Sequence, residues 1–194
     1  GLADLILLQM TDKTLEEEAE PYIEEEKGVA DAQEAIQGAM DIIAESIADE
    51  ADYRMAIRKR TADQGMLVST AKNPEEKTVY ENYYEFESRI SRLSGYQVLA
   101  INRGEKEKVL TVKIEAPEEE ILRYLNKKVI TRGEGGIRDC LEKTIEDSYT
   151  RLIAPSIERE IRNELTERAE DGAIRVFGKN LEQLLMQPPI AGRV

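Results

Sequence analysis

Residues 137–165, IRDCLEKTIEDSYTRLIAPSIEREIRNEL, carry the strongest periodic signal in the chain. Their large apolar side chains recur every three or four positions at Ile137, Leu141, Ile145, Tyr149 and Leu152, and after Pro155 every four positions at Ile157, Ile161 and Leu165. Apolar residues at this spacing line one face of an α-helix, so the stretch predicts long amphipathic helices that continue nearly to Gln187. Pro155 is expected to interrupt them, and Ser156 can cap the helix that follows.

A second helix is expected after Asp31, which can cap it, with Glu34 three residues further on. The apolar positions of this helix are Ala32, Ala35, Ile36, Ala39, Met40, Ile43 and Ile47. They again follow the helical period, so this stripe is expected to face the core.

Two shorter helices complete the N-terminal part. Thr14 and Glu17 have the spacing of a capping box. Asp49 or Asp52 can cap another helix, which is expected to end at Gly65 because glycine favours helix C-termini.

The middle of the chain predicts a small β insertion. Residues 66–71, 96–102 and 109–114 are short runs rich in β-branched and aliphatic residues. Gly104 lies in the polar connection between the last two runs, which therefore predict an antiparallel hairpin. Residues 78–93 place their apolar side chains mostly at helical spacing, so one helix is expected within the insertion.

The expected fold class is mainly α, multihelical with a small antiparallel β insertion. Residues 1–194 are expected to form a single helical region. It would consist of acidic helices over 1–65, the insertion over 66–116 and long helices over 117–194.

The negative charge is concentrated at one end of the chain. The chain carries a formal net charge of −13, and residues 1–53 hold 16 acidic but only 2 basic side chains. The favoured interpretation is a solvated helical face, with a basic protein partner or a divalent cation as alternatives. The glutamate triplets at 16–18 and 24–26 are consecutive, so they fan around a helix and lack the alternating spacing of a calcium loop.

The composition excludes much catalytic and metal chemistry. The sequence has no histidine and one cysteine, Cys140, so it cannot build a Ser-His-Asp triad, a histidine metal site or an internal disulfide. No apolar run is long enough to cross a membrane. We therefore expect no enzyme, no cofactor, no metal site and no membrane partner.

One basic cluster is a candidate nucleic-acid contact. It consists of Arg54, Arg58, Lys59 and Arg60. Arg54 and Arg58 share a helix face, and the other two extend the cluster. The alternative is a solvated helix end, where cations also suit the helix dipole.

An aromatic group is a second candidate for contact with bases. It consists of Tyr80, Tyr83, Tyr84 and Phe86. These rings could stack on nucleic-acid bases, but acidic residues separate them instead of basic ones. Packing within the fold is therefore the favoured interpretation.

The C-terminal third resembles a known family. Residues 151–162 (RLIAPSIEREIR), 173–181 (AIRVFGKNL) and 184–194 (LLMQPPIAGRV) resemble a block of the bacterial Tex family of transcription accessory proteins. Residues 38–45 (GAMDIIAE) are similar to an earlier block of that family. So are Tyr83-Tyr84 and the expected turn at Arg103-Gly104-Glu105.

This resemblance implies a piece of a long, multidomain, cytoplasmic protein. In the family, a helical N-terminal region precedes an RNase-H-like domain, helix-hairpin-helix motifs and an OB-fold RNA-binding domain. The resemblance places this chain in the helical region, ending just before the RNase-H-like domain, with the downstream domains absent.

The expected function is therefore a helical scaffold in a nucleic-acid-binding transcription accessory protein. The scaffold would position the downstream RNA- or DNA-binding modules, and transcription machinery is a further expected partner. Direct contact with nucleic acid by the basic cluster at 54–60 is the alternative.

Overall fold

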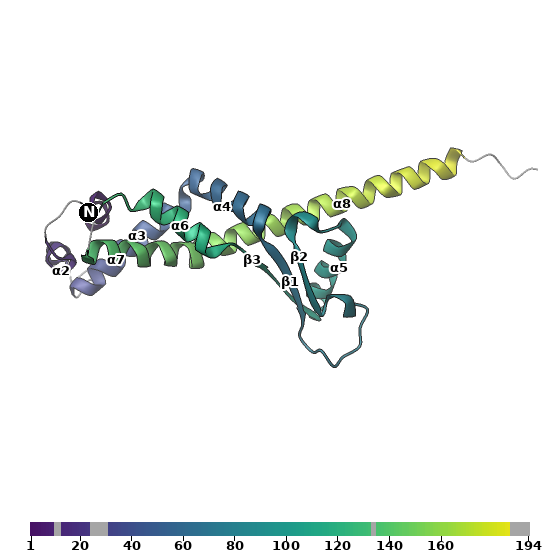
Figure 1. The fold of residues 1–194 in the computed structure, drawn as a ribbon, viewed down its shortest axis with the longest axis horizontal. Coiled ribbons are helices and arrows are strands. Elements are labelled where there is room, and N and C mark those ends of the chain that lie inside the picture. Colours follow the sequence, from purple (N-terminus) through teal and green to yellow (C-terminus); the bar gives the residue numbers. More distant parts are fainter. Residues whose placement is uncertain (10–12, 24–30, 133–134, 187–194) are drawn as a thin grey trace, which may run out of the picture. The chain divides into compact units, whose positions relative to one another are not determined.

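The computed structural model describes residues 1–9, 13–23, 31–132 and 135–186. The chain divides into two compact units. Unit 1 contains residues 1–62 and 116–158, and unit 2 contains residues 63–115 and 159–194. The described part of the chain is mainly helical, with a three-stranded antiparallel sheet in unit 2, so the expected fold class is confirmed (Figure 1).

Unit 1 is built from helices. Their bounds are α1 Leu2–Leu8, α2 Leu15–Ala19, η1 Glu20–Tyr22, α3 Ala32–Asp49, α4 Ala51–Gln64, α6 Glu118–Val129, α7 Gly135–Asp147 and η5 Ser148–Ile153. The central helix is α3, which packs against α1, α2, α7 and η5. Unit 1 is therefore a helical assembly around one long amphipathic element.

Two of the expected helix caps are confirmed. The Thr14 hydroxyl accepts a hydrogen bond from the Glu17 amide at 3.2 Å. The Asp31 carboxylate accepts one from the Glu34 amide at 2.9 Å. Each cap satisfies an amide that has no partner within the helix, which fixes where α2 and α3 begin.

The expected cap of α4 is wrong. Asp49 is the last residue of α3, and Asp52 lies inside the first turn of α4. Glu50 occupies the junction, where its carbonyl accepts from the Arg54 amide at 3.1 Å. The expected end of this helix is confirmed, because α4 finishes at Gln64, directly before Gly65.

The core of unit 1 is aliphatic. Its large, fully buried side chains are Ile6, Ile43, Ile57, Ile121, Leu125, Leu141, Ile145, Ile153 and Ile157. Burial of each such side chain contributes roughly 1.5–3 kcal/mol. Since these residues come from both sequence segments of the unit, the core joins 1–62 to 116–158.

The long C-terminal helices are continuous through the proline. The π-helical turn η5 leads directly into α8, Ala154–Met186, and Pro155 lies in the first turn of α8. In the π-helical turn the Ala154 amide bonds to the Tyr149 carbonyl, five residues back. A π-helical turn shifts each backbone hydrogen bond by one carbonyl, from four to five residues back. The helix thereby accommodates the ring of Pro155 and its missing amide hydrogen without a break. The expected interruption is therefore wrong, and the expected end near residues 187–189 lies outside the described residues.

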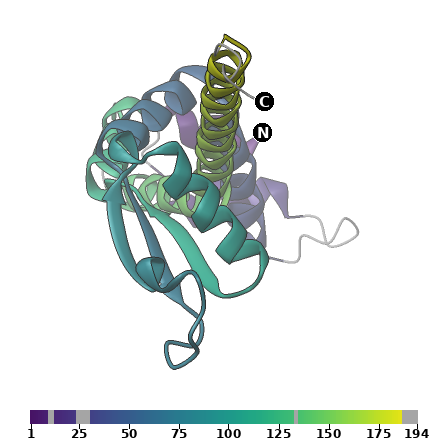
Figure 2. The same cartoon turned by 90° about the vertical axis from the view of Figure 1, so that its right-hand side faces the viewer.

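Unit 2 contains the sheet. Its strands are β1 Met66–Ala71, β2 Glu85–Arg89 and β3 Leu110–Glu115, in the order β2-β1-β3. Met66 in the central strand is opposite Arg89 on one side and Glu115 on the other. The helix α5, Gly95–Lys106, packs against β3, and Figure 2 shows it beside the strands. Short helices η3 (Glu81–Tyr83) and η4 (Ile90–Arg92) flank β2.

The strand expected at 96–102 is wrong, because these residues belong to α5. The Ser94 amide donates to Gln97 Oε1 at 3.0 Å and helps to start the helix. Val98 and Ile101, three positions apart, are both buried. The β-rich composition of this run is thus overridden by a helix start signal and by packing of one helical face.

Gly104 is a helical residue and not a hairpin turn. A Cβ atom at this position would lie 2.5 Å from Leu110 Cδ1 and 2.8 Å from Leu110 Cγ. The glycine therefore lets α5 approach β3 closely. The turn before β3 uses Lys108, whose φ of 62° lies in the left-handed region.

The helical interpretation of 78–93 is also wrong in its main part. Residues 85–89 form the strand β2, in which half-buried and exposed residues alternate. The strands at 66–71 and near 109–114 are confirmed.

Candidate interaction surface

The basic cluster predicted on α4 does not act as one group in the structure. Arg54 is half-buried, and its Nη1 donates to the Ala48 carbonyl at 3.1 Å. Its Nη2 donates to Ser156 Oγ at 2.6 Å, so Ser156 accepts from an arginine instead of capping a helix. Arg54 therefore links the end of α3 to the start of α8 within unit 1.

Arg60 serves a different contact. Its guanidinium lies 4.3 Å from the centre of the Tyr124 ring, and its Nε is 3.6 Å from Glu120 Oε1. Arg58 is half-buried and Lys59 is exposed, and both also take part in intramolecular interactions. The structure thus assigns Arg54 and Arg60 to separate contacts, and nucleic-acid binding by the four residues stays a prediction.

A second basic group lies on α6. Two adjoining depressions of about 680 and 410 Å³ share Arg123 and Lys127. We call them together the α6 groove, lined by Arg60, Glu119, Glu120, Leu122, Arg123, Tyr124, Asn126, Lys127, Lys128, Ile130 and Arg138. All of these residues belong to unit 1.

The α6 groove has a cationic lining in an acidic chain. Five lining residues are basic and two are acidic. Arg123 and Lys127 are exposed, and neither forms an ion pair with a residue that the structure describes. Arg138 is paired with Glu142 at 3.1 Å. Arg123 and Lys127 thus lie four residues apart on one helix face with no ion-pair partner among the described residues.

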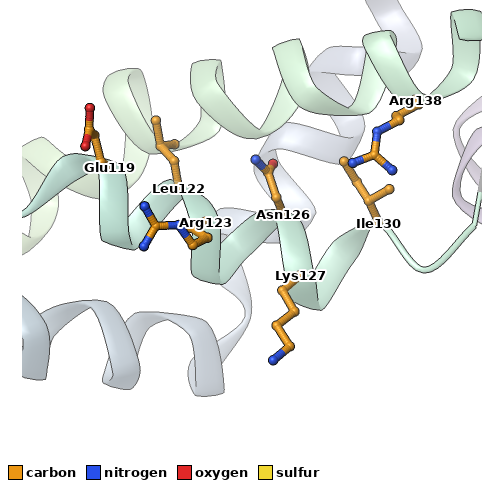
Figure 3. Close-up of a pocket in the computed structure, with 7 residues that line it drawn as sticks. All are labelled: Glu119, Leu122, Arg123, Asn126, Lys127, Ile130 and Arg138. Atoms are coloured by element: carbon orange, nitrogen blue, oxygen red, sulfur yellow. The ribbon is translucent and has the colours of Figure 1, made fainter. Parts of the chain in front are cut away.

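The groove also has an apolar part. Leu122, Asn126 and Ile130 are spaced by four residues and are half-buried. Figure 3 shows them on the side of α6 from which Arg138 of α7 approaches, while Lys127 projects away. Cationic and apolar surfaces therefore lie next to each other along one helix.

Tyr124 is enclosed by its neighbours. Besides Arg60, Lys128 lies 5.9 Å from the ring centre, and Tyr53 meets the ring edge-on at a centroid distance of 6.3 Å. Burial and the nearby Glu50 raise the pKa of Tyr53. Because Arg60 covers one face of its ring, Tyr124 does not offer that face to a nucleic-acid base.

The aromatic group of unit 2 is used for packing, as the favoured interpretation predicted. Tyr80 is buried, and Tyr83 contacts Phe86 at 5.2 Å in a T-shaped pair. The Tyr84 hydroxyl donates to the Glu76 carbonyl at 2.6 Å. These rings stabilise the segment that leads into β2.

Sequence reasoning missed the α6 groove, although a signal was present. Residues 123–128 read RYLNKK, which places three cations at positions i, i+4 and i+5 of a helix. Because the same helix begins with Glu118, Glu119 and Glu120, its charges resemble an ordinary dipole pattern. Only the packing of α4 and α7 beside α6 reveals that Arg60 and Arg138 join this group.

Among the described residues, no group of three or more histidine, cysteine or acidic side chains is arranged to hold a metal ion. None of the helices described is both long enough and apolar enough to cross a membrane.

Comparison with known proteins identifies the family. The family described as "Tex central region-like" matches residues 11–177. "Uncharacterized protein YdcI" of Bacillus subtilis is 49% identical over 195 residues, covering 99% of this chain and 27% of the relative. Human "S1 RNA-binding domain-containing protein 1" is 33% identical, covering 86% of this chain and 18% of the relative. "Transcriptional accessory protein Tex" of Neisseria gonorrhoeae is 27% identical, covering 100% of this chain and 26% of the relative.

The chain thus spans only about a quarter or less of these curated relatives. The family match covers most of the chain, and it agrees with the resemblance of the C-terminal third. This chain belongs to the Tex family of transcription accessory proteins.

Proposed function

We propose that this chain is a non-catalytic helical scaffold that positions the nucleic-acid-binding modules of a longer, cytoplasmic transcription accessory protein. The observation that carries the proposal is a set of side-chain hydrogen bonds that link segments distant in sequence within one unit. We call each such link an internal brace. Ser148 Oγ donates to the Ala44 carbonyl at 2.6 Å, and Gln9 Nε2 donates to the Val129 carbonyl at 3.0 Å. Gln9 Oε1 accepts from the Arg132 amide at 3.0 Å. Such contacts stiffen helix packing because each satisfies a polar group that would otherwise lack a partner.

Unit 2 has a brace of the same kind. Arg162 of α8 donates to Asn102 Oδ1 at 3.0 Å and to Glu105 Oε1 at 2.7 Å. Asn102 in turn donates to Thr166 Oγ1 at 2.9 Å. Two helices of one unit are thereby held in a fixed register, which suits a part that must present other modules in a defined way.

The charge of the chain supports placing nucleic-acid binding elsewhere in the longer protein. A net charge of −13 repels a phosphate backbone, whereas nucleic-acid-binding domains are usually basic. The human relative is named for an S1 RNA-binding domain, and a module of that kind would supply the contact. Transcription machinery is a proposed further partner of the scaffold.

A titration with labelled RNA and DNA tests whether nucleic-acid binding lies outside residues 1–194. Two proteins are compared at low and at physiological ionic strength: residues 1–194 alone, and the Bacillus subtilis relative with its matching segment replaced by this chain. We expect salt-dependent binding by the chimera and none by residues 1–194. Tight binding by residues 1–194 alone would overturn the proposal.

The alternative remains contact with nucleic acid by the basic cluster on α4. Because Arg54 and Arg60 hold the fold together, the test uses Arg58→Ala with Lys59→Ala in the chimera. The alternative predicts weaker RNA or DNA binding and a smaller salt dependence. An unchanged affinity dismisses it.

A further inference from the structure

The α6 groove combines two surfaces that one class of ligand can use together. Arg123 and Lys127 offer cationic groups without an ion-pair partner among the described residues. Leu122 and Ile130 form a half-buried apolar strip beside them. A ligand that fits must supply both negative charge and apolar side chains.

We propose that the α6 groove is the docking site for an acidic peptide segment that carries aliphatic side chains. The aliphatic side chains would cover Leu122 and Ile130, while carboxylates would pair with Arg123 and Lys127. Guanidinium and carboxylate groups form paired, charge-assisted hydrogen bonds, which gives this arrangement directional specificity. The depressions of about 680 and 410 Å³ are of the size that accepts a few side chains.

Two observations favour a peptide over a nucleic acid in this groove. The ring of Tyr124 is covered on one face by Arg60, so no base can stack on that face. The apolar strip of Leu122 and Ile130 would be left unused by a phosphate backbone, whereas aliphatic side chains of a peptide can cover it.

The charge of the whole chain acts in the same direction. With a net charge of −13, the chain repels a ligand in proportion to the ligand's own charge. A short peptide with a few carboxylates meets a smaller barrier than an oligonucleotide with one charge per phosphate. Charge complementarity is thus local to the groove, which suits a compact ligand.

Fluorescence anisotropy with defined probes tests the proposal on residues 1–194. The first probe is a labelled Glu-Leu-Glu-Glu-Leu-Leu-Glu-Glu peptide, and the second has each leucine replaced by serine. The third probe is a labelled oligouridine of the same net charge as the peptides. The test variant is Arg123→Glu with Lys127→Glu.

A matched control variant is Arg89→Glu with Lys106→Glu, which makes the same charge change at exposed positions of unit 2. We expect the leucine peptide to bind more tightly than the other two probes. The groove variant should weaken that binding by about tenfold or more, and the control variant should change it less than about twofold. Thermal unfolding of both variants by circular dichroism verifies that the fold is retained.

Three outcomes would overturn the proposal. The groove variant could bind the leucine peptide as the unmodified chain does, in which case the peptide does not use this site. The serine peptide could bind equally well, which would exclude a role for Leu122 and Ile130. Tighter, groove-dependent binding of the oligouridine would identify a nucleic acid as the ligand instead.

Discussion

The two units of this chain are stabilised in different ways. Among the described residues, the large, fully buried side chains of unit 1 number nine, whereas unit 2 has three, Leu67, Ile101 and Leu110. In unit 2, β2 alternates between half-buried and exposed residues, and a close approach at Gly104 brings α5 against Leu110. Stability in unit 1 is therefore spread over many contacts, while unit 2 depends on a few.

The largest expected loss of stability comes from creating a cavity in the core of unit 1. Leu141→Ala removes a fully buried side chain of α7 and should lower the free energy of unfolding by about 3 kcal/mol. Urea denaturation measures the loss, and hydrogen exchange localises it. Leu184→Ala is the control, because Leu184 is exposed and its loss should cost less than about 0.5 kcal/mol.

The comparison predicts that exchange after Leu141→Ala increases mainly in residues 1–62 and 116–158. An equal increase in 63–115 would contradict it, since the two units would then unfold as one.

A smaller effect is expected from crowding the contact in unit 2. Gly104→Val places atoms where Leu110 Cδ1 already lies, so the free energy of unfolding should fall by about 2–3 kcal/mol. Protection from exchange should be lost in residues 63–115. Gly172→Val is the matched control, because this helical glycine has nothing within 4 Å of a Cβ atom and the change should be nearly neutral. Similar melting temperatures for Gly104→Val and the unmodified chain would refute the close-approach argument.

The pH dependence of unit 1 should reflect Tyr149. Burial first, and then Glu118 and Glu158, raise the pKa of this phenol from 10.0 to about 12. Because the folded pKa lies above the unfolded one, the associated stability is complete below pH 10 and is lost as the pH rises toward 12. The loss should be roughly 2 kcal/mol at most.

Urea denaturation across this pH range measures the effect, with Tyr149→Phe as the variant that lacks the ionisable group. The variant should lose less stability between pH 10 and 12 than the unmodified chain. Burial also raises the pKa of Tyr53 and Tyr83, so a residual slope is expected. Identical slopes for both proteins would show that Tyr149 ionises as freely in the folded chain as in the unfolded one.

The smallest expected effect is a gain in stability. Gly38 lies inside α3 with nothing within 4 Å of a Cβ atom, so Gly38→Ala should stabilise the chain by about 0.5–1 kcal/mol. Gly104→Ala should have the opposite sign, because Leu110 fills the space. Melting temperatures of the two variants, measured side by side, should therefore rise for Gly38→Ala and fall for Gly104→Ala. A rise for both variants would contradict the close approach at Gly104.

The helices of unit 1 were predictable because their signals are local. The caps at Thr14 and Asp31 and the stripe that contains Ile43 and Ile47 depend on residues a few positions apart. The mixed unit was harder to predict. Val98 and Ile101 have strand-forming side chains, and the helix is selected by the start signal at Ser94 together with packing of one helical face against β3.

The candidate surface could be predicted only in part for the same reason. Arg54 and Arg60 are neighbours in a cluster along the sequence, but their partners, Ser156 and Tyr124, lie far along the chain and separate them. Conversely, Arg60 and Arg138 join the α6 groove from elements distant in sequence. Local charge patterns reveal candidate residues, whereas tertiary packing decides which of them share a surface.

The π-helical turn before Pro155 sets the angular phase of the helix that follows it. One residue of an α-helix corresponds to a rotation of about 100°, so deleting a single position from Ser148–Ile153 would turn the side chains at the start of α8 by that angle. Ile157, which is buried in unit 1, would then leave its present direction. A one-residue change in this turn would therefore remove an apolar side chain from the core of unit 1 without altering the sequence of α8.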